Sequence, residues 1–100
     1  MVKKPIVMWN KIAESTLQKA YREIKIESPQ NAIKVRDGIL SETRRLANGP
    51  EIYPPDKFKR DNPGNYRAFE KYSYRVAYRH TEKEIRNLRI RHVKQEPRMY

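Results

Sequence analysis

The first half of the chain has the apolar spacing of one short strand and two helices. Residues 5–9, "PIVMW", form an apolar run with β-branched residues, which predicts a first β-strand. Asn10 follows it and is expected to cap a helix. The apolar stripe of that helix recurs at helical spacing, at Ala13, Leu17, Ala20, Tyr21 and Ile24.

A second helix is predicted directly after the first. Ser28 is a favourable cap, and Pro29 suits a first helical position. Its apolar positions are Ala32, Val35, Ile39, Leu40, Leu46 and Ala47. Gly49 and Pro50 are expected to end it. Because the turn between the two helices is so short, we expect an antiparallel hairpin.

The second half of the chain is patterned as strands. Residues 50–65 contain four prolines and are expected to form a loop before strands at about 66–72, 74–80 and 84–93. The alternation assigns these residues to the core: Tyr74, Val76, Tyr78, Leu88 and Ile90. The predicted fold is therefore α+β in the order β-α-α-β-β-β. A helical hairpin would pack on one face of a small antiparallel sheet, in a single domain over residues 1–100.

Charge is concentrated in this second half. The net charge is +11, and residues 57–100 carry 13 basic and 5 acidic side chains. Alternation puts arginines on the face opposite the core, namely Arg75, Arg79, Arg89 and Arg91, with Arg67 and Lys71 if the preceding strand is in register. A solvated basic face is the ordinary interpretation. Arginine on rigid strands, with few interleaved acids, instead favours an anionic partner such as nucleic acid or an acidic protein.

Several classes of chemistry find no support in the sequence. There is no cysteine, and no cluster of histidines and carboxylates has metal-ligand spacing, so we expect no metal and no cofactor. His92 falls on the apolar side of its strand and is expected to be partly buried. The N-terminal apolar run is too short for a signal peptide or a spanning helix, so we expect a cytoplasmic protein without a membrane partner.

Four phrases together resemble one known family. "SPQNA", "NGPEI", "YRVAYR" and "IRNLRIRHVKQEP" occur in the order found in the RelE/ParE toxin superfamily of bacterial type II toxin–antitoxin systems. The resemblance covers nearly the whole chain, and the paired helices and the "HVKQEP" ending are closer to the ParE-like branch. It implies a toxin that inhibits growth and is neutralised by a cognate antitoxin, acidic or amphipathic, with which it would form a hetero-oligomer.

The resemblance implies two different activities. A ParE-like protein would poison DNA gyrase by binding it, without chemistry of its own. A RelE-like protein would cleave mRNA on the ribosome, with Arg75 on the scissile phosphate, Arg67 or Lys94 adding charge, and His92 or Tyr100 moving protons. A third possibility is a basic family member that only binds its antitoxin. Whether the protein is an enzyme stays open at this point.

Overall fold

The computed structural model describes residues 4–100, so the first three residues of the predicted domain lie outside the described residues. The elements in chain order are β1 (Ile6–Trp9), α1 (Lys11–Glu27), α2 (Pro29–Arg45), the 3-10 turn η1 (Leu46–Asn48), β2 (Tyr66–Lys71), β3 (Tyr74–His80) and β4 (Glu84–His92). The predicted α+β class and the order β-α-α-β-β-β are both confirmed.

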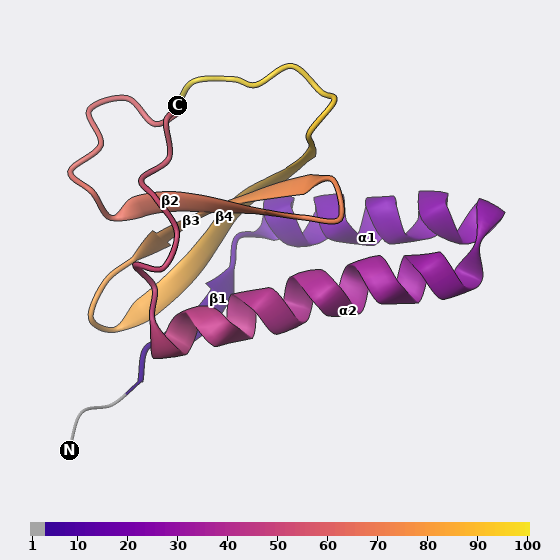
Figure 1. Ribbon diagram of the computed structural model, residues 1–100, viewed down its shortest axis with the longest axis horizontal. Helices are drawn as coiled ribbons and strands as arrows, with labels where there is room; N and C mark the ends of the chain where they lie inside the picture. Colours follow the sequence, from indigo (N-terminus) through magenta and orange to yellow (C-terminus); the bar gives the residue numbers. More distant parts are fainter. Residues whose placement is uncertain (1–3) are drawn as a thin grey trace.

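The four strands form one mixed sheet in the order β1-β4-β3-β2. Strands β2, β3 and β4 make the predicted antiparallel meander, whereas β1 joins the edge of β4 in parallel. The parallel pairing is possible because the helical hairpin carries the chain back across one face before the meander begins. Figure 1 shows the two helices along one side of the sheet, with the C-terminal segment arching over the other.

The helix boundaries follow the capping residues, with one exception. The Ser28 side chain accepts a hydrogen bond from the backbone N–H of Asn31 at 3.1 Å, and Pro29 is the first residue of α2, as predicted. Asn10 does occupy the N-cap position of α1, but the prediction that its side chain caps the helix is wrong. Its Oδ1 instead accepts a hydrogen bond from Arg86 of β4 at 3.2 Å, which ties the start of α1 to the sheet.

The core lies between the helical hairpin and the inner face of the sheet. Its members come from every layer: Ala13, Leu17, Val35, Ile39, Leu46, Phe69, Val76, Tyr78, Ile85 and Ile90. Tyr78 is fully buried, and its hydroxyl donates a hydrogen bond to the carbonyl of Pro50 at 2.5 Å. That bond holds the start of the long loop against the centre of the sheet. It also gives the buried hydroxyl a hydrogen-bond partner, which avoids the cost of burying an unpaired polar group.

The prediction that Leu88 belongs to the core is wrong. The pairing between β3 and β4 shifts between Ala77 and Tyr78, where Arg89 lies opposite Ala77 and Asn87 lies opposite Tyr78. Leu88 is the extra residue of this β-bulge and is only half-buried, whereas Asn87 is fully buried. A bulge resets the alternation of a strand, because one residue is left without an opposite partner.

The turn between β2 and β3 has an unusual backbone. Its two central residues, Tyr72 and Ser73, have φ values of 49° and 69°, the left-handed region that glycine or asparagine normally occupies. The Tyr72 ring lies against Gly38 in the middle of α2, where a Cβ atom would meet Cε2 of the ring at 2.3 Å. The carbonyl of Ser73 accepts a hydrogen bond from Val93 at 2.8 Å, so this turn also fixes the residue that follows β4.

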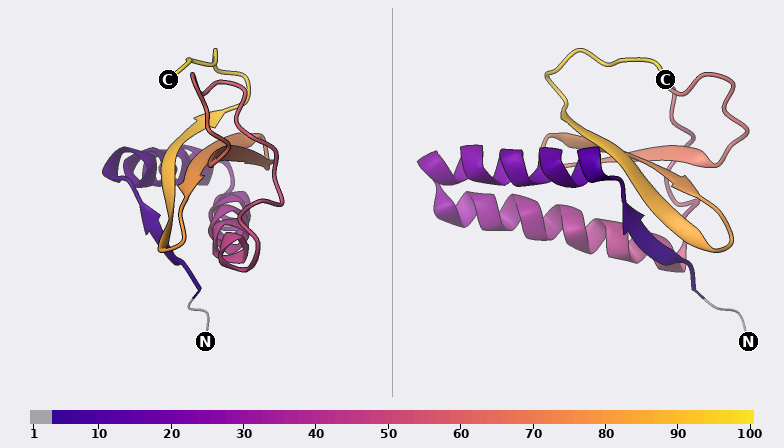
Figure 2. Two further views of the ribbon diagram at one scale, coloured as in Figure 1. Left: turned by 90° about the vertical axis from the view of Figure 1, so that its left-hand side faces the viewer. Right: turned by 180° about the vertical axis from the view of Figure 1, so that it is seen from behind.

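The termini and the long loop complete the arrangement. The long loop starts beside the end of α2, and its part around Phe58 and Arg60 meets the C-terminal residue above the sheet, which Figure 2 shows from two further directions. Over residues 4–100, no helix combines the length and the apolar character that crossing a bilayer requires.

Candidate functional site

The outer face of β3 and β4 carries a row of paired arginines. The cross-strand register places Arg75 opposite Arg91 and Arg79 opposite Arg86, with Arg89 opposite Ala77. The four arginines that the alternation assigned to this face do share it. Arg86 joins them because the bulge shifts the alternation, and the sequence offered no sign of that shift. We call these five residues, Arg75, Arg79, Arg86, Arg89 and Arg91, the arginine face.

Arg67 and Lys71 lie on the opposite side, so their predicted placement on the arginine face is wrong. In the β2–β3 register, Arg67 is opposite Tyr78 and Lys71 is opposite Tyr74, both of which face the helices. The guanidinium of Arg67 donates to the carbonyls of Gly64 at 3.0 Å and Tyr53 at 2.6 Å, so it holds the loop before β2. Phe69 was the available signal. It lies two residues from both Arg67 and Lys71, so all three side chains share one face of the strand, and a phenylalanine is expected on the buried face.

Arg75 is held by two carboxylates and is almost closed off from solvent. Its Nη2 lies 2.8 Å from Oδ1 of Asp56, and its Nη1 lies 3.2 Å from Oε2 of Glu70. The side chains of Arg75 and Asp56 are 13% and 2% exposed. The Phe58 ring lies against the guanidinium, with 5.0 Å between the ring centroid and Cζ. The arginine that was expected to be exposed is therefore already paired within the chain.

Asp56 is the residue that sequence reasoning missed. It comes from the proline-rich loop, 19 positions before Arg75. Besides Arg75, its Oδ1 accepts the backbone N–H of Phe58 at 3.1 Å, and its Oδ2 accepts the hydroxyl of Tyr100 at 2.6 Å. The one signal available was a single acid between a proline pair and a basic run, in "PPDKF".

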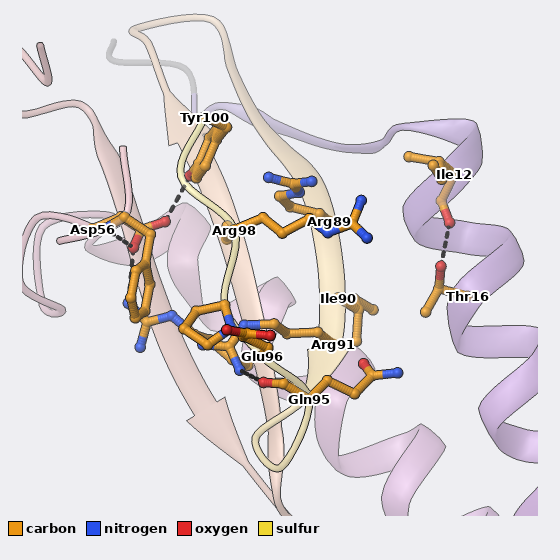
Figure 3. Close-up of a pocket in the computed structure, with 14 residues that line it drawn as sticks. Ile12, Thr16, Asp56, Arg89, Ile90, Arg91, Gln95, Glu96, Arg98 and Tyr100 are labelled. Carbon is orange, nitrogen blue, oxygen red and sulfur yellow. Dashed lines mark hydrogen bonds and ion pairs between the residues drawn. The ribbon is translucent and has the colours of Figure 1, made fainter. Parts of the chain in front are cut away.

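Tyr100 brings the C-terminal segment onto this site. Its backbone N–H donates to the carbonyl of Phe58 at 3.0 Å, and its own carbonyl accepts the N–H of Arg60 at 2.6 Å. Arg89 and Lys59 each lie against its ring, with 4.8 and 5.7 Å to the ring centroid. Figure 3 shows the hydroxyl pointing at Asp56, and the segment between Gln95 and Tyr100 running in front of the sheet.

A cavity of about 540 Å³ lies beneath this segment. Arg89, Arg91 and Arg98 line it, and Ile12 and Thr16 of α1 form its far wall. Figure 3 shows these two α1 residues facing Arg89 across the opening. With guanidinium groups on the floor and an isoleucine side chain on the far wall, the cavity suits an anionic group attached to an apolar one.

Protonation in the site follows its hydrogen bonds. Burial opposes ionisation of Asp56, but the hydrogen bonds from Tyr100 and Arg75 outweigh it and hold the pKa of that carboxyl below its usual value. Burial, together with the Asp56 carboxylate, raises the pKa of the Tyr100 hydroxyl well above the usual value. The aspartate is therefore ionised and the tyrosine neutral at neutral pH, which is the combination that their hydrogen bond requires.

The remaining candidates for proton transfer do not gather around Arg75. His92 pairs with Tyr74 on the inner side of the sheet, where the two rings meet edge to face at 5.2 Å. Its Nδ1 accepts the backbone N–H of Lys94 at 3.1 Å, while Lys94 itself is exposed. His92 is thus partly buried, as predicted. General acid–base catalysis needs a group within hydrogen-bonding reach of the reacting atoms, and the sheet separates His92 from Arg75. Within residues 4–100, no cluster of potential metal ligands occurs.

The fold and the site define a small α+β protein with an arginine face, in which Arg75 is paired with two carboxylates. The chain matches the family described as "ParE toxin of type II toxin-antitoxin system, parDE" over residues 7–97, and it belongs to that family. Among solved structures it is similar to one described as "Chromosomal ParDE TA system from P. aeruginosa", with a TM-score of 0.70 and 21% identity. That match covers 89% of this chain and 96% of the other. Comparison with curated protein sequences gave no match.

Proposed function

We propose that this protein is the growth-inhibiting toxin of a bacterial type II toxin–antitoxin pair, and that it acts in the cytoplasm by binding DNA gyrase. Membership of the ParE toxin family supports the class. The observation that carries the mode of action is the pairing of Arg75 with Asp56 and Glu70. An arginine engaged by two carboxylates is a poor stabiliser of a pentavalent phosphate, because the charge it would offer is already neutralised.

The same geometry favours binding over RNA cleavage. The Tyr100 hydroxyl donates its proton to Asp56, which is itself bound to Arg75, and His92 lies across the sheet. A ribonuclease would need an acid and a base on either side of one phosphate. No observation specifically supports that alternative, so ribonuclease activity is retained only as an outcome to be measured.

The decisive experiment compares two targets with one protein preparation. Purified protein should block plasmid supercoiling by gyrase and cause linear DNA to accumulate, while mRNA on translating ribosomes should acquire no new ends. In cells, induction should cause filamentation and a DNA-damage response before translation slows. The opposite pair of results, new mRNA ends with intact supercoiling, would refute the proposal in favour of the nuclease.

The arginine face supplies a matched test of where the target binds. Arg89 is exposed and has no acidic partner among the described ion pairs, so its removal should leave the fold intact. Arg89→Ala should weaken gyrase inhibition about 10- to 100-fold, the usual cost of one charged hydrogen bond. Lys19→Ala, an exposed cation on α1, is the control and should inhibit as the parent does. Equal inhibition by both variants would place the target elsewhere.

The antitoxin forms the second half of the proposal. A chain with net charge +11 is expected to bind an acidic or amphipathic partner, encoded beside it, and to be neutralised by that partner. The two should co-purify from the native operon, and co-expression should restore growth. If the protein captures such a partner but never inhibits growth, it is a family member that only binds its antitoxin.

A further inference from the structure

The C-terminal segment divides into a fixed part and a part held mainly at one end. Residues 92–95 form a closed turn, in which Gln95 N–H donates to the carbonyl of His92 at 2.9 Å and Arg91 donates to the carbonyl of Gln95 at 3.1 Å. Residues 96–100, which we call the strap, then cross the cavity to reach Tyr100.

The strap is weakly attached along its length. Residues 96–99 are all exposed, and none of them takes part in a hydrogen bond within the described residues. Local opening is least costly where buried contacts and hydrogen bonds are few. Everything that holds the strap down is therefore concentrated at its last residue, Tyr100.

Tyr100 is attached by its hydroxyl, its backbone and its ring. The hydroxyl bond to Asp56 has an ionised acceptor and is 2.6 Å long, which places it in the stronger class of hydrogen bonds. The same carboxylate also binds Arg75, so the end of the strap and the innermost arginine of the face share one anchor. Releasing Tyr100 would free a hydrogen-bonding position on Asp56 and open the cavity that Arg75, Arg89 and Arg91 line.

We propose that the strap is a releasable cover on the arginine face, latched by the Tyr100 hydroxyl on Asp56, and that an acidic segment of a partner binds when the strap is open. The inference rests on the proposed function in one respect, that the arginine face is the partner surface. The chain's own ion pairs indicate the chemistry of the ligand, since Arg75 already binds two carboxylates on this face. Arg89 and Arg91 on the same face have no acidic partner among the described ion pairs and would bind the incoming carboxylates.

The latch is tested by hydrogen exchange with Tyr100→Phe, which keeps the ring and removes only the hydroxyl. Loss of a hydrogen bond to a charged group should raise the population of the open strap roughly 10- to 100-fold. The backbone N–H of Arg60 reports opening, because it donates to the carbonyl of Tyr100 and should exchange faster by that factor. The N–H of Asp56, which donates to Tyr66, should be unaffected.

Tyr66→Phe is the matched control. Tyr66 lies edge to face with Tyr100 at 6.3 Å, but its hydroxyl makes no hydrogen bond within the described residues. Its loss should leave the exchange of Arg60 unchanged. If Tyr100→Phe also leaves it unchanged, the hydroxyl is not a latch and the proposal is overturned.

The covering role is tested by binding to a fluorescein-labelled peptide of twelve glutamates. Since apparent affinity scales with the fraction of protein in the binding-competent state, Tyr100→Phe should bind this peptide about 10- to 100-fold more tightly than the parent. Faster exchange at Arg60 without tighter binding would overturn the covering role. A gain for a 12-nucleotide DNA strand but not for the peptide would overturn the carboxylate specificity.

These measurements separate the strap from the proposed function. Exchange and peptide binding are measured on the purified protein and need no toxicity. A parent protein that leaves gyrase untouched would refute the proposed target while the strap result stood. If the toxin does act on gyrase, the latch is still refuted when Tyr100→Phe leaves the exchange rate of the Arg60 N–H unchanged.

Discussion

Gly38 gives the sharpest test of how the hairpin turn is seated on the helices. Glycine in the middle of a helix normally costs about 1 kcal/mol relative to alanine, so Gly38→Ala should stabilise α2 if the position were open. Here a Cβ atom would lie 2.3 Å from Cε2 and 3.0 Å from Cδ2 of Tyr72. Because such separations are not tolerated, the Tyr72 ring has to leave its place.

The size of the destabilisation follows from the contacts that the Tyr72 ring would lose. Tyr72 is 42% exposed, so somewhat more than half of a tyrosine is packed, and displacing it should cost about 1–2 kcal/mol. Lys34 and Lys71 lie 5.3 and 4.9 Å from the ring centroid, and each contact adds about 0.5 kcal/mol at an exposed site. Against a propensity gain of about 1 kcal/mol, Gly38→Ala should destabilise the protein by about 1–2 kcal/mol.

Urea unfolding of a double-mutant cycle measures this effect. In a Tyr72→Ala background the ring is absent, so Gly38→Ala should become stabilising by about 1 kcal/mol, which implies a coupling of about 2–3 kcal/mol between the two sites. The reasoning is refuted if Gly38→Ala stabilises the parent protein, or if its effect is the same in both backgrounds.

Three further predictions concern the turn and the site. Ser73→Gly should stabilise the protein by about 0.5–1 kcal/mol in urea unfolding because φ is 69° there, whereas Ser15→Gly in α1 should destabilise it by about 1 kcal/mol; equal effects would contradict this. Arg75→Ala leaves Asp56 buried without its cation and should cost about 3–5 kcal/mol, so wild-type stability would contradict the pairing. The pKa of Asp56 in the folded protein lies below the usual 3.8, so ionised Asp56 stabilises the fold fully above pH 3.8, and this stabilisation is lost as the pH falls through the folded-state pKa. Melting temperatures of Asp56→Asn should therefore lack this loss at acid pH. A pH profile identical to that of the parent would refute the assignment.

The helices and strands could be predicted from the sequence because each depends mainly on residues close to it in the chain. Helical spacing and the cap at Ser28 predicted α1 and α2 to within a few residues, and the alternation around Val76 predicted β3 from end to end. Such local patterns reflect which face of one element must bury, and that depends on few distant residues.

The sequence was a poorer guide to the side of the sheet on which a residue lies. Alternation fixes which residues of one strand share a face, but the turn between strands sets how two alternations combine. The two-residue turn at Tyr72 and Ser73 places Arg67 with Tyr78 on the inner side. The bulge at Leu88 then moves Arg86 onto the outer side. A shift of one residue reverses every side chain beyond it, so small changes in pairing moved several candidates at once.

The sequence by itself determined a basic, cysteine-free α+β protein with arginines alternating along its last strands. Only the tertiary structure decided that the innermost of these, Arg75, is paired with Asp56 from a loop 19 residues away, and that Asp56 also accepts the hydroxyl of Tyr100. Contacts of that kind depend on loop closure and on how far a chain end folds back. No periodicity records either of these, because proline-rich and terminal segments have no repeating face to bury.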